Sequence, residues 1–202
     1  KSLLRSIDHY TDIAEQEINV LYTSRPDIPY ESLINDFKCN FLREESFLDD
    51  LNRIIASSSN DYVMFMVDDL IVRDRFSLRG IERFLDKRSD VDCFSLRLGR
   101  NIQDGQDPSF SVCDESILVW DTAPGLGKTW NYFWELSSSV YRKELVQRYL
   151  RKCGRNNVSF PNPLEQRYYT RMPTHIREGY GNKRLLVKLR FLISNKNNRM
   201  AC

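Results

Sequence analysis

The chain has 202 residues, of which 41% are hydrophobic and 29% are charged, and its formal net charge is +2. This length suffices for one α/β domain with a sizeable core. The small net charge argues against a dedicated nucleic-acid-binding domain, because such domains usually carry a strong basic excess. We therefore expect no nucleic-acid partner.

The cysteines indicate a reducing compartment. They form neither a CxxC pair nor a Cys/His cluster with zinc spacing, and their odd number fits free thiols. The five positions are Cys39, Cys93, Cys113, Cys153 and Cys202. Neither a signal-peptide pattern nor an apolar run of about 18 residues is present, so we expect a cytoplasmic protein.

The N-terminal segment begins with a helical pattern. Leu3, Leu4 and Ile7 share one face, which predicts a helix over residues 2–10. Because an α/β domain usually starts with a buried strand, we expect a first strand ahead of Lys1 that is missing here.

Short apolar runs and helical patterns then alternate. Residues 18–22 predict a buried strand that ends in a polar loop at Thr23-Ser24-Arg25. A short helix over residues 30–36 and a brief strand over residues 40–42 follow.

A capped helix and an apolar strand come next. Ser46 is the predicted N-cap, with Asp49 three residues on as in a capping box. Residues 63–67 are uniformly apolar, as expected for a strand that is covered on both faces. A helix over residues 75–86 and a strand over residues 91–96 complete this section.

The alternation of strands and helices predicts a largely parallel sheet with right-handed crossovers. Ligands in such sheets bind beyond the carboxyl ends of the strands. Two polar segments lie at such ends, namely Thr23-Ser24-Arg25 and Asp68-Asp69.

The second half of the chain is less regular. Residues 99–130 are predicted to be a long loop region, of the kind that is often functional. Residues 140–153 predict a helix with Gly154 as its C-cap, and a short helix is expected to open at Asn162. We expect one domain over residues 1–202, divided into a donor half (1–98), an acceptor half (99–178) and a basic C-terminal helix or tail (179–202).

The adjacent acids Asp68 and Asp69 are the main candidates for chemistry. Like charges in close contact repel, so such a pair favours an intervening cation. Carboxylate oxygens are suitable ligands for Mg²⁺ or Mn²⁺, which in turn bind a diphosphate. The structural alternative is that the pair caps the next helix or binds Arg73 or Arg75.

The segment around these acids, Phe65-Met66-Val67-Asp68-Asp69-Leu70-Ile71, resembles the DxD-type segment of GT-A glycosyltransferases, especially those of family 2. This chain has x-Asp-Asp where many members have Asp-x-Asp. The likeness covers most of the chain and rests chiefly on the order of the elements. It also includes Leu3 to Ile7, Thr23 to Arg25, Arg43 to Glu45, and Trp134 to Ser137 ahead of Tyr141-Arg142.

The resemblance implies a fold and a donor site. The fold would be a GT-A, Rossmann-like, three-layer α/β/α sandwich with a mostly parallel central sheet. Asp68 would lie near the donor ribose, and Asp69, together with Asp68, would bind Mn²⁺ or Mg²⁺. The other donor-binding candidates are Thr23, Ser24 and Arg25 at the nucleotide base and Arg43 at the diphosphate; each of these has the alternative of being a solvated loop residue.

The implied reaction moves a sugar from a nucleoside diphosphate sugar, most simply a UDP-sugar, to a hydroxyl of a glycan or lipid-linked glycan, with inversion. An inverting enzyme needs a general base, for which Glu165 is favoured over Glu135. The alternative for Glu165 is an acid at a helix N-terminus that complements the helix dipole. Trp134 and Glu135 are candidates for acceptor binding, since aromatic faces pack on sugar rings; packing in the core is the alternative for the aromatic residues of this segment, Trp130, Tyr132, Phe133 and Trp134. His175 is a candidate third metal ligand, with a structural or surface role as the alternative.

The C-terminal stretch is basic. Residues 183–193 predict an amphipathic helix that can contact an anionic membrane, or that docks on the domain by its apolar face. The first alternative would place the protein peripherally on the cytoplasmic membrane face.

Two further functions compete. A sugar-nucleotide nucleotidyltransferase uses a related sheet, but it usually opens with a Gly-rich loop after its first strand. The only such string here, residues 125–129, is mid-chain, and Thr122 stands where a P-loop needs its first glycine. The non-enzymatic alternative is an inactive glycosyltransferase-like binding module, against which the acids Asp68, Asp69 and Glu165 argue.

Overall fold

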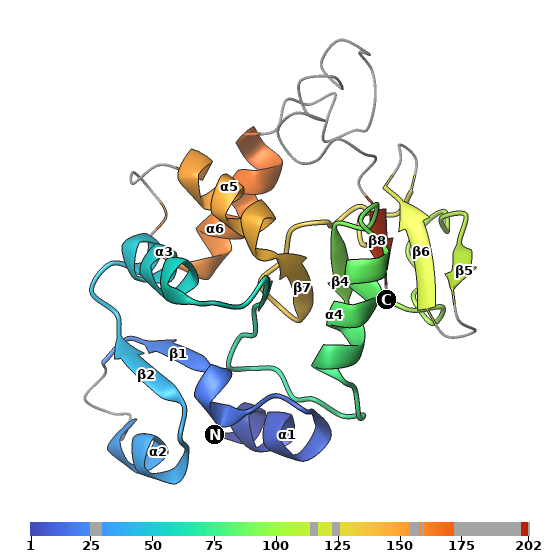
Figure 1. Ribbon diagram of the computed structural model, residues 1–202. Helices are drawn as coiled ribbons and strands as arrows, with labels where there is room; N and C mark the ends of the chain where they lie inside the picture. The colour runs from blue at the N-terminus through green and yellow to red at the C-terminus, as the bar shows by residue number, and fades with distance from the viewer. Residues whose placement is uncertain are drawn as a thin grey trace.

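The computed structural model describes residues 1–24, 30–113, 117–122, 126–153, 158, 160–171 and 199–201. These form a mixed α/β protein with a two-stranded and a six-stranded sheet (Figure 1). In chain order the elements are α1 (Ser2–Tyr10), η1 (Glu15–Glu17), β1 (Asn19–Tyr22), α2 (Tyr30–Asp36), β2 (Asn40–Arg43), α3 (Phe47–Ser57), β3 (Tyr62–Met64), α4 (Leu78–Lys87), β4 (Cys93–Ser95), β5 (Ser111–Cys113), β6 (Ile117–Asp121), β7 (Ser139–Arg142), α5 (Lys143–Cys153), α6 (Pro161–Arg171) and β8 (Arg199–Ala201).

The strand directions differ from the expected mostly parallel sheet. The small sheet, β1–β2, is parallel, and the large sheet has the order β3-β7-β4-β8-β6-β5. Within the large sheet β4 and β8 pair in parallel, whereas the other four described pairings are antiparallel. The expectation is wrong for this sheet because β7 runs between β3 and β4 in the direction opposite to both.

Helices cover both faces of the large sheet. Side chains of a strand alternate between the two faces, and this alternation sorts the core. Phe94 and Val140 pack with Ile81, Phe84 and Leu85 of α4. Cys93 and Tyr141, the neighbours of Phe94 and Val140 in sequence, pack on the opposite face with residues of α3, α5 and α6. Figure 1 shows these three helices gathered apart from α4.

The local predictions for about the first 45 residues are confirmed. The helices over residues 2–10 and 30–36 and the two strands that became β1 and β2 are present. Ser46 is the N-cap of α3, as predicted, but its hydroxyl donates to the Asp49 carboxylate at 3.1 Å and caps no backbone N–H. Asp50 instead ties the helix to the residues ahead of it, because its carboxylate accepts hydrogen bonds from the N–H groups of Glu45 and Ser46 at 2.8 and 3.0 Å.

Three element predictions need correction. The apolar run 63–67 is not a central strand: β3 ends at Met64, lies at one end of the sheet order and is half-buried. The predicted loop region 99–130 contains β5 and β6. The predicted helix 140–153 begins only at Lys143, because the preceding residues pair in the sheet as β7, and apolar periodicity does not separate a short buried strand from a helical turn.

Candidate functional site

The acid pair, Asp68 and Asp69, lies in a turn that follows β3. A hydrogen bond of 3.1 Å from the N–H of Leu70 to the carbonyl of Val67 closes this turn. Both acids are exposed, and within the described ranges neither carboxylate forms an ion pair or a hydrogen bond. The pair is therefore not bound to the arginines that follow it in the chain, and it is accessible to a ligand.

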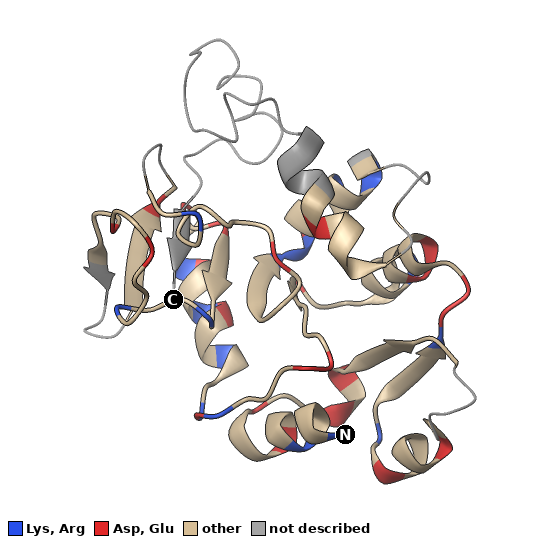
Figure 2. Cartoon of the chain, turned by 180° about the vertical axis from the view of Figure 1, so that it is seen from behind, with Lys and Arg blue, Asp and Glu red and all other residues tan. Residues whose placement is uncertain are grey.

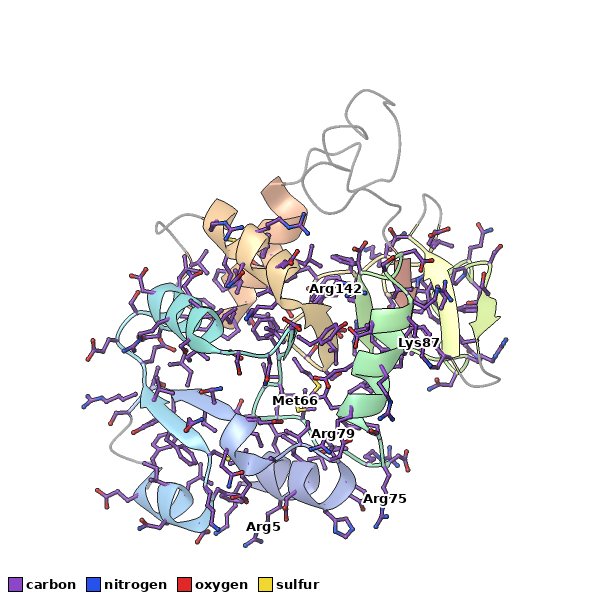
Figure 3. All side chains as sticks on the ribbon, viewed as in Figure 1. Arg5, Met66, Arg75, Arg79, Lys87 and Arg142 are labelled. Atoms are coloured by element: carbon purple, nitrogen blue, oxygen red, sulfur yellow. The ribbon has the colours of Figure 1, made fainter. Side chains whose placement is uncertain are left out.

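The loop after the acid pair is held against α1. The N–H of Val72 donates to Ser6 Oγ at 3.0 Å, and the N–H of Phe76 donates to the carbonyl of Tyr10 at 3.1 Å. Met66, just ahead of the turn, lies toward the middle of the molecule in Figure 3. The turn is thus anchored to the sheet on one side and to α1 on the other.

Ser138 connects the acid-pair segment to β4. Its N–H donates to the carbonyl of Phe65 at 2.8 Å, and its own carbonyl accepts from the N–H of Leu96 at 3.2 Å. Its φ of 85° lies in the left-handed region, which residues other than glycine rarely adopt. Such strained backbone persists only where its surroundings hold it, and it clusters at functional sites. The ends of β3 and β4 and the start of β7 therefore meet at one edge of the sheet.

Glu135 is a buried carboxylate at this edge, with only 1% of its surface exposed. Ser139 Oγ donates to its Oε1, and Ser137 Oγ donates to its Oε2 at 3.3 Å. Arg97 Nε also donates to Oε2, at 2.7 Å. Burial raises the pKa of Glu135, while the contacts with Ser139 and Arg97 oppose that rise. Both oxygens of Glu135 are thus occupied within the protein.

Glu165 lies on α6, half-buried, and reaches the same segment. Its Oε1 accepts a hydrogen bond from the N–H of Leu136, and its Oε2 accepts one from the hydroxyl of Tyr132 at 3.2 Å. Burial and then the charge of Glu165 raise the pKa of Tyr132 to about 12, so this hydroxyl stays protonated at neutral pH and can donate. Glu165 therefore does more than complement the dipole of its own helix, since it joins α6 to residues 132–136.

Arg97 completes what we call the Glu135 network, which consists of Arg97, Tyr132, Glu135, Ser137, Ser139 and Glu165. Its guanidinium carbon lies 6.0 Å from the centroid of the Tyr132 ring. Nothing in the sequence marks this arginine, because one basic residue two positions after a strand forms no pattern. Glu135 and Glu165 were candidates from the sequence, and the serine run 137–139, which follows Glu135 closely, was the signal for Ser137 and Ser139.

The predicted acceptor-binding residue Trp134 belongs to the core, which is the alternative expected for the aromatic residues. None of its surface is exposed. Its ring packs on Tyr149, Tyr141 and Phe65, with centroid distances of 4.4, 5.0 and 6.0 Å. The apolar character of the aromatic segment, residues 130–134, fits both sugar binding and core packing. Contacts with residues distant in sequence place Trp134 in the core. Tyr132 is the half-buried member of this segment.

The candidate donor-binding residues lie on the small sheet. Thr23 and Ser24 are exposed and follow β1. Arg43 ends β2, is exposed and pairs in register with Tyr22. Arg25 lies outside the described residues. None of the contacts found in the described ranges joins Thr23, Ser24 or Arg43 to the Glu135 network.

A metal site is only partly formed by side chains. No group of three or more His, Cys, Asp and Glu residues in the described part of the chain is placed to hold a metal ion, and His175 lies outside that part. The residues present still fit Mg²⁺ or a similar ion, because such ions are commonly held by one or two carboxylates with water and substrate phosphates. Asp68 and Asp69 are exposed carboxylates of this kind.

Other surface features add no second candidate. A hollow of about 420 Å³ lies between η1 and α2, and none of the candidate residues lines it. Figure 2 shows acidic and basic residues interspersed over the helices.

Among the described helices, none has the length and apolar character needed to span a bilayer. The predicted membrane-contacting helix 183–193 lies outside the described residues, as does Gly154. Cys39 and Cys93 are free thiols, as expected.

Comparison with known proteins gives one relative. The chain is 27% identical over 186 residues to a protein of Dictyostelium discoideum named "Bifunctional glycosyltransferase pgtA". The alignment covers 80% of this chain and 24% of that protein, so the chain spans about a quarter of its relative's length. No protein-family model matches the chain, and no solved structure matches it significantly.

Proposed function

We propose that this chain is a glycosyltransferase domain of the GT-A type, related to family 2, which moves a sugar from a nucleoside diphosphate sugar to a hydroxyl group. The name of its Dictyostelium relative supports this class. The structural observation that carries the proposal is the link through Ser138. It brings the segment of an exposed acid pair to the same sheet edge as a half-buried carboxylate on another element, Glu165.

The donor is proposed to be a UDP-sugar. Asp68 would face the ribose, and Asp69, with Asp68, would hold Mn²⁺ or Mg²⁺, to which His175 is a further candidate ligand. The metal, when bound, stabilises the charge that develops on the leaving diphosphate. The roles of Thr23, Ser24 and Arg25 at the base and of Arg43 at the diphosphate remain proposals that rest on the family resemblance.

Glu165 is proposed as the general base. In the transfer step the acceptor oxygen forms a bond to the anomeric carbon, and the bond from that carbon to the diphosphate oxygen breaks. The acceptor proton passes to Glu165, and the nucleoside diphosphate leaves with the bonding electron pair. Glu135 is the weaker candidate, because it is buried and already bound to Arg97, Ser137 and Ser139. Inversion at the anomeric carbon follows from a single displacement of this kind.

The acceptor is proposed to be a glycan or a lipid-linked glycan, bound by the 99–178 half. A cytoplasmic location is proposed with it, and contact of residues 183–193 with an anionic membrane would suit a lipid-linked acceptor.

The test is a thermal-shift screen of nucleotide sugars with and without Mn²⁺, followed by measurement of released nucleoside diphosphate. A ligand that binds the folded state raises the melting temperature. The proposal expects a metal-dependent shift with one nucleotide sugar and slow hydrolysis of that compound in the absence of acceptor. Metal-dependent binding of UDP without turnover of any sugar nucleotide would leave only the inactive binding module.

A further inference from the structure

Arg97 presents a fixed cationic group at the sheet edge. Its Nε donates to Glu135 Oε2 at 2.7 Å, and the side chain of Glu135 is 2% exposed while that of Arg97 is 38% exposed. A charge-assisted hydrogen bond to a buried carboxylate is short and directional. The inner side of the guanidinium is therefore held by the protein, and its outer part is open to solvent.

The terminal nitrogens of Arg97 remain available. Nη1 and Nη2 form no hydrogen bond with any residue in the described ranges. The Glu135 carboxylate, which accepts from Nε, is itself held by hydrogen bonds from Ser137 and Ser139. These hydrogen bonds within the protein therefore orient the guanidinium. An arginine whose free N–H groups are preoriented matches the paired oxygens of a phosphate group.

The position of Arg97 relates it to the acid pair. Leu96, the residue before it, donates its N–H to the carbonyl of Ser138, and Ser138 donates its N–H to the carbonyl of Phe65, three residues before Asp68. Three residues span at most about 10 Å even when fully extended. A cation-bound diphosphate at Asp68 and Asp69 would therefore lie at the sheet edge from which the guanidinium projects.

We propose that Arg97 binds a phosphate group of the sugar donor and that Glu135 is the positioning residue that orients it. This rests on the proposed function, because it takes the diphosphate to lie at the acid pair. It assigns a role to two residues that the reaction step above leaves unused. It also explains why a carboxylate is buried beside three donors: the ion pair preorganises the arginine for an anion.

The experiment compares Arg97→Gln and Arg97→Lys with the wild-type chain. Calorimetry with UDP and Mn²⁺, and separately with inorganic pyrophosphate and Mn²⁺, measures the affinity for phosphate. Loss of one charge-assisted contact of about 1.5–3 kcal/mol predicts a 10- to 100-fold weaker affinity of Arg97→Gln for both probes. Arg97→Lys should lose less, since a lysine keeps the charge but not the paired geometry. The matched control is Arg100→Gln, which removes an exposed arginine three positions on in the same loop.

The outcomes separate this inference from the function. Wild-type binding of pyrophosphate that is lost in Arg97→Gln supports the role of Arg97 even if no sugar is transferred, in which case only the proposed function fails. If Arg97→Gln binds both probes as the wild type does, or if the wild type binds neither, the inference is overturned. A change confined to the KM for the acceptor would place the phosphate on the acceptor and would equally overturn the assignment to the donor. Melting temperatures of all variants report whether the fold survives, and Arg97→Lys keeps a cation beside Glu135 if the glutamine variant does not fold.

Discussion

Glu165 Oε1 accepts a hydrogen bond from the backbone N–H of Leu136, the residue that follows Glu135. Glu165 thus contacts the residue next to Glu135, but the surroundings of the two glutamates differ. Glu135 is enclosed and bound to Arg97, whereas Glu165 is half-buried, and its hydrogen bonds come from a backbone N–H and a tyrosine hydroxyl. No ion pair joins Glu165 to an arginine or lysine in the described ranges, in contrast to Glu135.

The first prediction concerns Glu165→Gln. The variant should still join α6 to residues 132–136, because its amide oxygen accepts from the N–H of Leu136 and its NH2 group can donate to the hydroxyl oxygen of Tyr132. It should bind UDP with Mn²⁺ as the wild type does, while kcat falls by about 10²- to 10⁴-fold with the loss of general-base catalysis. Steady-state kinetics and calorimetry check the two halves of this statement. Glu144→Gln, an exposed acid on α5, is the control, and an unchanged kcat in Glu165→Gln would transfer the role of base to Glu135.

The second prediction concerns Asp69→Asn. This exposed side chain has no partner in the described ranges, so its replacement should leave the melting temperature unchanged. Metal-dependent binding of UDP should be abolished, because a neutral amide is a poor substitute for a carboxylate ligand. Asp74→Asn removes an exposed acid from the same loop and should bind as the wild type does. Undiminished binding in Asp69→Asn would remove this residue from the site.

The third prediction concerns the strained residue Ser138. Its φ of 85° is easily adopted by glycine and strongly resisted by a β-branched residue. Ser138→Val should therefore lower the free energy of unfolding by about 1–2 kcal/mol relative to Ser138→Gly. Urea denaturation of both variants measures this difference. Equal stability of the two variants would mean that the backbone at this position relaxes to an unstrained conformation.

The fourth prediction concerns pH and the cap of α3. The N–H groups of Ser46 and Glu45 donate to the Asp50 carboxylate, and these contacts, with Arg53, hold its pKa below the usual value of 3.8. Since the folded-state pKa is depressed, the stabilisation by Asp50 is fully present above the unfolded-state pKa and is lost as pH falls through the folded-state value. Asp50→Asn should thus be less stable than the wild type by a constant amount between about pH 5 and 7, and the difference should shrink below about pH 4. Denaturant titrations over this range test the trend, which a difference that persists at about pH 2 would contradict.

Local features of the fold were predictable. The helices α1 and α2 and the strands β1 and β2 follow from apolar spacing and polar breaks within a few residues, which act wherever the segment lies in the molecule. The position of the acid pair after a strand was likewise predictable, since it depends only on the end of an apolar run. The end of that strand was less predictable, because the apolar run continues past Met64 whereas the pairing with β7 ends there.

The arrangement of the site depended on contacts between distant residues. Arg97 and Glu135 are separated by 38 positions, and Ser138 lies far along the chain from Phe65, to which it bonds. The burial of Trp134 likewise depends on residues that are distant in sequence, since its ring packs on Phe65 and Tyr149.

The sequence by itself therefore determined the N-terminal elements α1, β1, α2 and β2 and the carboxylates that carry the proposed chemistry. The tertiary structure alone decided that β7 enters between β3 and β4 against their direction. It also decided that Ser137, ahead of β7, and Ser139, its first residue, donate hydrogen bonds to the Glu135 carboxylate. The physical reason is that periodicity reports which side chains avoid water, whereas strand order and ion pairing depend on which surfaces meet after the chain has folded.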